Sequence, residues 1–209
     1  MNKTIICDTR EKGNKEILDY FASINQDYKI AKLDAGDYMI EGEPEIIIDK
    51  KDTLLEICSN LTGKKKKANG TYERNRERLK REVERAHNLG CKEFIFLIQD
   101  DTINSINDVA KWYSRLTRVS GKQLYGIMKQ FKENNDCKFL IVKPQDMGKT
   151  IIDLLTKKWY NLIVIEILQL QYSIPLAQHS GNISRYRIMA NTSVFQTDNM
   201  GSTPIIWSI

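Results

Sequence analysis

The chain has 209 residues, of which 41% are hydrophobic and 28% are charged, and its formal net charge is +5. A chain of this size can bury one ordinary core, so we expect one main domain. Its N-terminus lacks the apolar core of a signal peptide, and no charge-free apolar run reaches about 18 residues. We therefore expect a soluble, cytoplasmic protein without a membrane partner.

Strand-like and helix-like segments alternate along the chain. The strand-like runs lie near residues 4–8, 28–33, 36–41, 45–51, 93–98 and 138–143. The helix-like runs lie near residues 14–24, 53–61, 71–89, 106–117, 121–134 and 145–158. This alternation, with a hairpin in the middle, predicts an α/β fold in which helices flank a mixed β-sheet.

The four cysteines are scattered and lie mostly inside apolar runs: Cys7, Cys58, Cys91 and Cys137. They form no Cys-x-x-Cys pair, and the chain has two histidines, so the sequence disfavours a zinc site. We interpret the cysteines as buried free thiols in a reducing compartment.

The segment from Gly36 to Lys51 carries the residues that point to chemistry. Strand side chains alternate faces, so Asp49 and Lys51 share a face and Lys50 points the other way. A hairpin between the two apolar runs would bring Asp37 to the same face. Two carboxylates without His or Cys suit Mg²⁺ or Mn²⁺, and an ammonium beside them can stabilise phosphate charge. The pattern predicts a metal-dependent phosphodiesterase, although charged residues that end a strand are often only solvated.

A strongly basic segment follows. Residues 64–92 hold eleven Lys and Arg against four Glu, an excess larger than that of the whole chain. A phosphate backbone is the natural partner of such a segment. The side chains that we expect to bind DNA lie in a lysine loop and on the helix after it: Lys64, Lys65, Lys66, Lys67, Arg74, Arg78 and Arg81. The alternative is an exposed helix whose arginines pair with Glu73 and Glu77.

The charge pattern changes beyond residue 160. Residues 161–209 hold four charged side chains, and most of this stretch is rich in Ser, Asn and Gln. We therefore divide the chain into a domain of residues 1–160 and an atypical, low-charge tail of residues 161–209. The tail is either a strand-bearing extension or a fused or frame-shifted segment without a selected fold, and we prefer the second interpretation.

An ordered set of motifs between residues 4 and 158 resembles that of a known nuclease family. The set comprises Asp-x-Arg-Glu at residues 8–11, Gly-Asp-Tyr at 36–38, Asp-x-Lys at 49–51, a Leu-rich helix and a basic Arg-x-x-Arg-Glu helix. It is similar to the XPF-type nuclease domain of the PD-(D/E)xK superfamily, in its stand-alone, phage-type form. The resemblance implies a restriction-endonuclease-like fold.

The resemblance also implies roles for single residues. Asp37, Asp49 and Lys51 match the metal-binding and catalytic positions of the family. Asp8 and Glu11 match its N-terminal acidic motif, Asp8 as a third metal ligand and Glu11 as a further catalytic residue. Arg10, in the same motif, is expected to contact DNA phosphate or to pair with a carboxylate.

Two departures from the family pattern stand out. Asp49 replaces the glutamate of the eukaryotic motif, which shortens the carboxylate arm by one methylene. Leu55 stands where the family has an aspartate, with Glu56 next to it, so the last acidic position is left unassigned.

The function implied is a Mg²⁺- or Mn²⁺-dependent DNA endonuclease of recombination, replication or repair. Its substrates would be branched DNA or single-strand/double-strand junctions, and its origin a phage or prophage in a bacterial cell. The alternative is a catalytically decayed DNA-binding or scaffolding protein of the same fold. Leu55 is a mild hint of this alternative, whereas the presence of Asp37, Asp49 and Lys51 argues against it. A restriction-type enzyme that reads a specific sequence is a third interpretation. A homodimer is left open.

Overall fold

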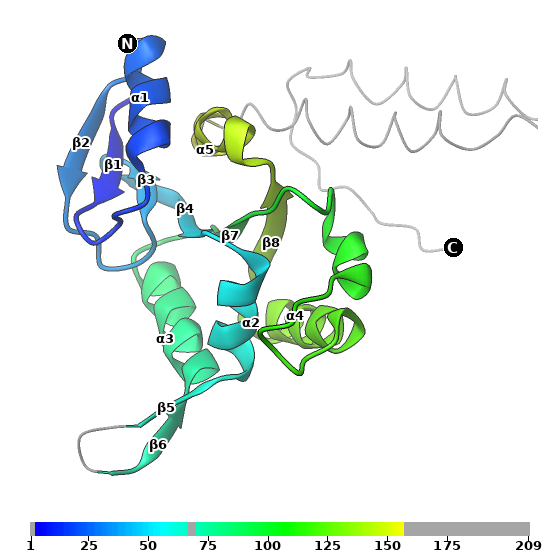
Figure 1. The fold of residues 1–209 in the computed structure, drawn as a ribbon. Coiled ribbons are helices and arrows are strands. Elements are labelled where there is room, and N and C mark those ends of the chain that lie inside the picture. The colour runs from blue at the N-terminus through cyan, green and yellow to red at the C-terminus, as the bar shows by residue number, and fades with distance from the viewer. Residues whose placement is uncertain (1–2, 67–69, 157–209) are drawn as a thin grey trace, which may run out of the picture. The chain divides into compact units, whose positions relative to one another are not determined.

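A six-stranded sheet in the order β2-β1-β3-β4-β7-β8 forms the centre of the molecule (Figure 1). The computed structural model describes residues 3–66 and 70–156, which belong to one compact unit. Lys67 and the tail of residues 161–209 lie outside the described residues. The strands are β1 (Ile5–Asp8), β2 (Tyr28–Ala31), β3 (Tyr38–Ile40), β4 (Glu43–Lys51), β7 (Glu93–Gln99) and β8 (Cys137–Val142).

The sheet is mixed, as the sequence predicts. β3 runs antiparallel to both β1 and β4, whereas the other neighbouring strands pair in parallel. The parallel strands are connected through helices and the antiparallel pair β3–β4 through a tight turn. The ends of β3 and β4 that meet away from this turn carry the residues expected at the site.

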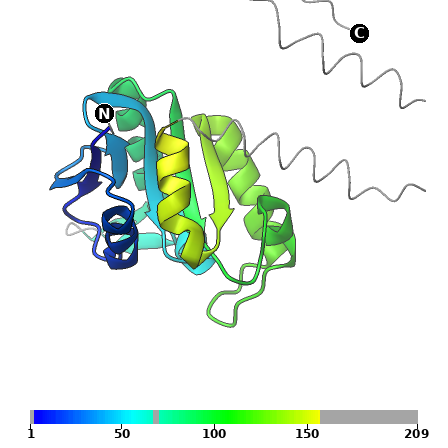
Figure 2. The same ribbon diagram turned by 90° about the horizontal axis from the view of Figure 1, so that it is seen from above.

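Helices cover both faces of the sheet (Figure 2). One face packs on α2 (Leu54–Thr62), α3 (Asn75–Asn88) and α4 (Gly121–Asn135), and the other on α1 (Lys15–Ser23) and α5 (Met147–Leu155). β4 lies between the two cores, so Ile47 faces α2–α4 while Ile46 and Ile48 face α1 and α5. A strand buried on both faces reads as a continuous apolar run, which explains Ile46-Ile47-Ile48.

Local signals fix where the helices begin. The Thr53 hydroxyl accepts a hydrogen bond from Glu56 N–H and starts α2 two residues after β4. Ser120 and Gln123 form a capping box at the start of α4. α3 buries Leu79, Val83 and Ala86, which recur at helical spacing along one face.

The structure corrects two predicted elements. The helix expected at residues 106–117 is a short 3₁₀ helix, Ile106–Lys111, and Trp112 after it is extended. No side chain caps the start of this helix, and the residues that follow it include aromatic residues and Ser, which are weaker helix formers. Lys64–Lys66 do not form a loop but a strand, β5, which pairs with β6 (Tyr72–Arg74), so α3 begins at Asn75. Figure 1 shows this β5–β6 hairpin projecting beyond α2 and α3.

The four cysteines are buried and free, as predicted. In the part of the chain that the structure describes, no helix is long and apolar enough to cross a bilayer.

Candidate active site

The β3–β4 hairpin brings Asp37, Asp49 and Lys51 together. Tyr38 lies opposite Ile48, so Asp37 precedes β3 beside the end of β4, where its Oδ2 accepts a hydrogen bond from Lys50 N–H at 2.8 Å. Asp49 and Lys51 follow Ile47 at period two and therefore face the α2–α4 side of the sheet. The predicted register of the three side chains is the one that the structure shows.

Asp49 has one oxygen that nothing in the described structure satisfies. The residue is 2% exposed, and its Oδ1 accepts a hydrogen bond from Lys51 Nζ at 2.5 Å. Its Oδ2 is buried without a hydrogen-bond donor. A buried carboxylate oxygen without a donor is costly, so such an atom calls for a ligand that the protein itself does not supply.

Asp37 interacts with the Asp49 carboxylate. Burial first, and then the neighbouring Asp49 carboxylate, raise the pKa of Asp37 to about 8, while Lys51 acts in the opposite direction. Without a cation the two carboxyl groups can make a hydrogen bond only when one of them is protonated. The pair therefore takes up either a proton or a positive ion.

Lys51 remains charged although it is 7% exposed. Burial alone would lower its pKa, but Asp49 and then Glu56 outweigh burial, and the pKa of Lys51 is raised. Glu56 Oε1 lies 3.8 Å from Lys51 Nζ. Glu56, the residue after Leu55, thus places a carboxylate near Lys51.

The residues present fit a hard divalent cation. Within the described residues, no three His, Cys, Asp or Glu side chains are grouped closely enough to hold a metal by themselves. Mg²⁺ needs only one or two protein carboxylates because it keeps several waters. Asp37 and the free Oδ2 of Asp49 could serve as such ligands, since both are hard oxygen donors.

Glu82 of α3 is a site residue for which the sequence interpretation gave no role. Its Oε1 accepts a long hydrogen bond, 3.4 Å, from the N–H of Gly36, the residue before Asp37. Burial and then Asp49 raise the pKa of Glu82. The available signal was its position three residues after Leu79 and next to Val83, on the margin of the buried stripe of α3.

A series of hydrogen bonds and ion pairs connects side chains of α2 and α3 at the edge of the site. Asn60 donates to Glu56 Oε1 at 3.4 Å and accepts from Arg78 Nη2 at 3.1 Å. Arg78 Nη1 in turn lies 3.9 Å from Glu82 Oε2. Arg78, predicted as a DNA-binding residue, is therefore exposed but tied to the edge of the site.

Asp8, predicted as a metal ligand, is occupied by other partners in this structure. Its Oδ1 accepts from the backbone and side chain of Arg10, both at 2.7 Å, and its Oδ2 from Arg10 Nη2 at 3.0 Å and from Leu33 N–H at 2.6 Å. Burial would raise the pKa of Asp8, but these bonds lower it. The described contacts make Asp8 the residue that positions Arg10, whose guanidinium also feels the charges of Glu82 and Asp37.

Glu11, predicted as catalytic, contacts the opposite face of β4. Its Oε1 lies 3.3 Å from Lys50 Nζ, and Lys50 also pairs with Asp52. The Lys50 side chain is 2% exposed and points away from Lys51, as expected from the strand period. Glu11 still contributes charge near Asp37, but the structure does not bring it to the Asp49–Lys51 face.

The basic residues divide into two groups. Lys64, Lys65 and Lys66 of β5 and Arg74 of β6 are all exposed on the hairpin. Arg81 instead makes a 2.7 Å ion pair with Glu73, which is the pairing considered as the alternative for this helix.

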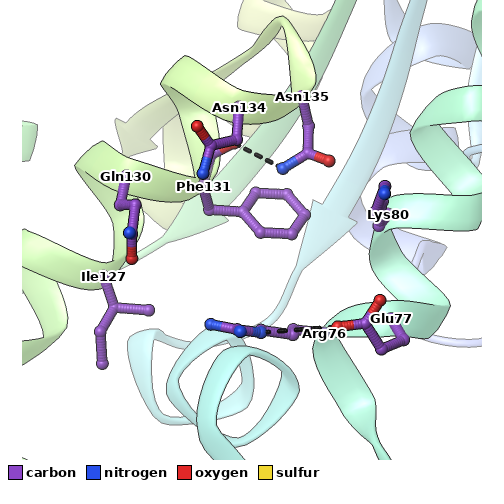
Figure 3. Close-up of a pocket in the computed structure, with 8 residues that line it drawn as sticks. All are labelled: Arg76, Glu77, Lys80, Ile127, Gln130, Phe131, Asn134 and Asn135. Carbon is purple, nitrogen blue, oxygen red and sulfur yellow. Dashed lines mark hydrogen bonds and ion pairs between the residues drawn. The ribbon is translucent and has the colours of Figure 1, made fainter.

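A pocket lies away from these residues, between α3 and α4 (Figure 3). Polar side chains surround Phe131 in it, and the lining residues are Arg76, Glu77, Lys80, Ile127, Gln130, Phe131, Asn134 and Asn135. None of the predicted catalytic residues lines it, so it is not the site of the proposed chemistry.

Comparisons with known proteins agree with this geometry. The ERCC4 domain family matches residues 7–155. Two solved structures are similar in fold. The first is XPF from Aeropyrum pernix, with 16% sequence identity and a TM-score of 0.52; the match covers 90% of this chain and 80% of that one. The second is XPF from Aeropyrum pernix in complex with DNA, with 13% identity and a TM-score of 0.52; the match covers 92% of this chain and 74% of that one. No curated protein has a sequence that matches this chain. The similar structures show that the mixed sheet and its helices have the fold of an XPF nuclease domain.

Proposed function

We propose, because this chain belongs to the ERCC4 domain family, that it is a metal-dependent endonuclease that hydrolyses phosphodiester bonds in DNA. The observation that carries the proposal is the Asp49 carboxylate, which interacts with Asp37 and Lys51 and whose buried Oδ2 has no donor. A purely structural carboxylate would be expected to have its hydrogen bonds satisfied.

Each residue of the site has a distinct task in this proposal. Asp37 and Asp49 would hold Mg²⁺ or Mn²⁺, which when bound polarises a phosphoryl oxygen and makes water a better nucleophile. Lys51 keeps its proton through Asp49 and Glu56, so it offers a positive charge to a phosphate at neutral pH. The Gly36 turn and the Lys50 N–H fix the position of the Asp37 carboxylate.

The β5–β6 hairpin supports DNA as the substrate. Lys64 lies directly opposite Arg74, and Lys66 opposite Tyr72, so three cations share one face of a two-stranded hairpin. Like charges directly across a strand pair destabilise it, and a polyanion bound on that face offsets the repulsion. The same face carries Tyr72, which is 68% exposed.

This hairpin also favours branched DNA over plain duplex. An exposed aromatic ring among cations can stack on an unpaired base, which a junction offers and an intact duplex does not. Proteins similar in fold include an XPF in complex with DNA. We therefore propose branched DNA and single-strand/double-strand junctions as the preferred substrates.

The test is cleavage of flap, fork, four-way junction, single-stranded and linear duplex DNA, each in Mg²⁺, in Mn²⁺ and in EDTA. We expect cleavage of junction substrates that requires the metal and is lost in the Asp49→Ala variant while DNA binding is kept. DNA binding without cleavage in any metal would support instead the decayed, scaffolding protein. Glu56 beside Lys51 speaks against that alternative, because it supplies the carboxylate that Leu55 lacks.

A further inference from the structure

Glu82 differs from the other glutamates of α3. Its side chain is 15% exposed, compared with 46% for Glu77 and 55% for Glu84. The latter two make ion pairs with Arg76 and Lys80 at the helix surface. Glu82 turns toward the sheet instead, so α3 presents a carboxylate to the face that holds Asp49.

The surroundings of Glu82 do not balance its charge. Its contacts are the long 3.4 Å bond from Gly36 N–H and Arg78 at 3.9 Å, which is shared with Asn60. Burial and then Asp49 raise the pKa of Glu82; Lys51 and Arg78 act in the opposite direction without offsetting them, and Lys51 already binds Asp49. Asp37, Asp49 and Glu82 thus bring three carboxyl groups together near Lys51, while Arg78 and Arg10 interact with the group from its exposed side. Bringing like charges together in a partly buried place is unfavourable unless a cation joins them.

We propose that Glu82 is the third carboxylate of the cation site and holds the ion through water. This inference rests on the proposed function. Asp37 and Asp49 would bind the ion directly, since their carboxyl groups interact and Asp49 Oδ2 is buried without a hydrogen-bond donor. Mg²⁺ retains several waters, and those waters need acceptors, which Glu82 would provide. Among the described residues no three carboxylates are grouped closely enough to hold a metal by themselves, so Glu82 is assigned to the waters and not to the ion.

A purely structural role makes a different prediction. If Glu82 served only to accept the Gly36 N–H, a glutamine in its place would keep that acceptor and leave ion binding unchanged. The Glu82→Gln substitution therefore removes the charge while it retains the hydrogen bond. Glu84→Gln, two residues further along the same helix, removes an equal charge at the surface and is the matched control.

The experiment is calorimetric titration of EDTA-stripped protein with Mn²⁺ and with Mg²⁺, with thermal unfolding of the metal-free protein in parallel. We expect Glu82→Gln to weaken ion binding about 10–100-fold, the range found for groups that hold a metal through its outer shell. Its metal-free melting temperature should be equal to or above that of the wild type, because repulsion is relieved. Glu84→Gln should bind the ion as the wild type does, and Glu82→Asp, which keeps the charge, should bind more tightly than Glu82→Gln.

Two results overturn the inference. Wild-type affinity in a folded Glu82→Gln variant would show that Glu82 only holds the Gly36 turn, and equal weakening by Glu82→Asp and Glu82→Gln would show that its charge is not what matters. Neither result touches the proposed function as long as the wild type binds the ion and cleaves DNA. A wild type that binds no ion would overturn the proposed function as well.

Discussion

Binding of the metal ion should depend strongly on pH because of Asp37. Burial and Asp49 raise the pKa of this carboxyl group to about 8 in the metal-free protein, so the ion has to displace a proton below that pH. The deprotonated fraction is about 1% at pH 6, about one half at pH 8 and about 90% at pH 9. Ion affinity should therefore rise roughly 90-fold between pH 6 and pH 9, most steeply below pH 8.

The same shift sets the pH dependence of stability without metal. The folded protein keeps a proton that an unfolded aspartate, with its ordinary pKa of 3.8, has already lost. A raised pKa stabilises the fold below the unfolded value, and this stabilisation is lost as the pH rises from about 4 through about 8. Metal-free protein should therefore become less stable over this window, and the Asp37→Asn variant should lack this contribution.

Calorimetry measures the coupling directly. Titration with Mn²⁺ near pH 7, in buffers with different ionisation enthalpies, should show nearly one proton released per ion bound. Asp19→Asn is the control, since Asp19 is exposed and paired with Lys15 on α1. An affinity that is constant from pH 6 to pH 8, without proton release, would refute the reasoning, because Asp37 would then be ionised before the ion arrives.

Three further predictions concern stability and DNA binding. Lys50→Ala should lower the free energy of unfolding by about 2–4 kcal/mol in urea denaturation, since it leaves the partly buried Glu11 without its partner; an unchanged midpoint would contradict the importance of this pair. Gly36→Ala should cost about 2–4 kcal/mol, because Gly36 has a φ of +66° and a Cβ there would lie 2.4 Å from Ile47 Cγ2; Gly42→Ala, at φ +75° with open space around it, is the control and should cost about half as much or less. Replacing Lys64, Lys65 and Lys66 together by Gln should reduce the slope of log affinity against log salt by up to about 2.7 on duplex DNA; an equal slope in wild type and variant would mean that these lysines do not contact phosphate.

The central part of the site could be predicted because it follows from short-range rules. Alternation along β4 places Asp49 and Lys51 on one face and Lys50 on the other, and the hairpin adds Asp37. These inferences need only the strand period and the turn. They required no knowledge of which helix covers the face.

What the sequence did not reveal depends on tertiary packing or on weak local signals. Glu82 enters the site because α3 packs against the sheet; the Arg-x-x-Arg-Glu motif ends on it and it lies beside the buried stripe, but neither signal gives it a role. Lys64–Lys66 form a strand without the alternating apolar residues that normally mark one. Glu56 approaches Lys51 because Thr53 starts α2 close to the end of β4, a geometric consequence of a helix cap.

The two-sided burial of β4 has a consequence for how the chain tolerates mutation. Asp49 and Lys51 face the candidate site. On the reverse side of the strand, Ile48 packs in the core and Lys50 pairs with Glu11. Adjacent positions are thus constrained by different properties, one by activity and the next by stability. A saturation mutagenesis scan that scores DNA cleavage and protein abundance separately should show effects that alternate with a period of two residues along this strand. Odd positions near its end should lose cleavage while the protein persists in the cell, and even positions should lose the protein itself.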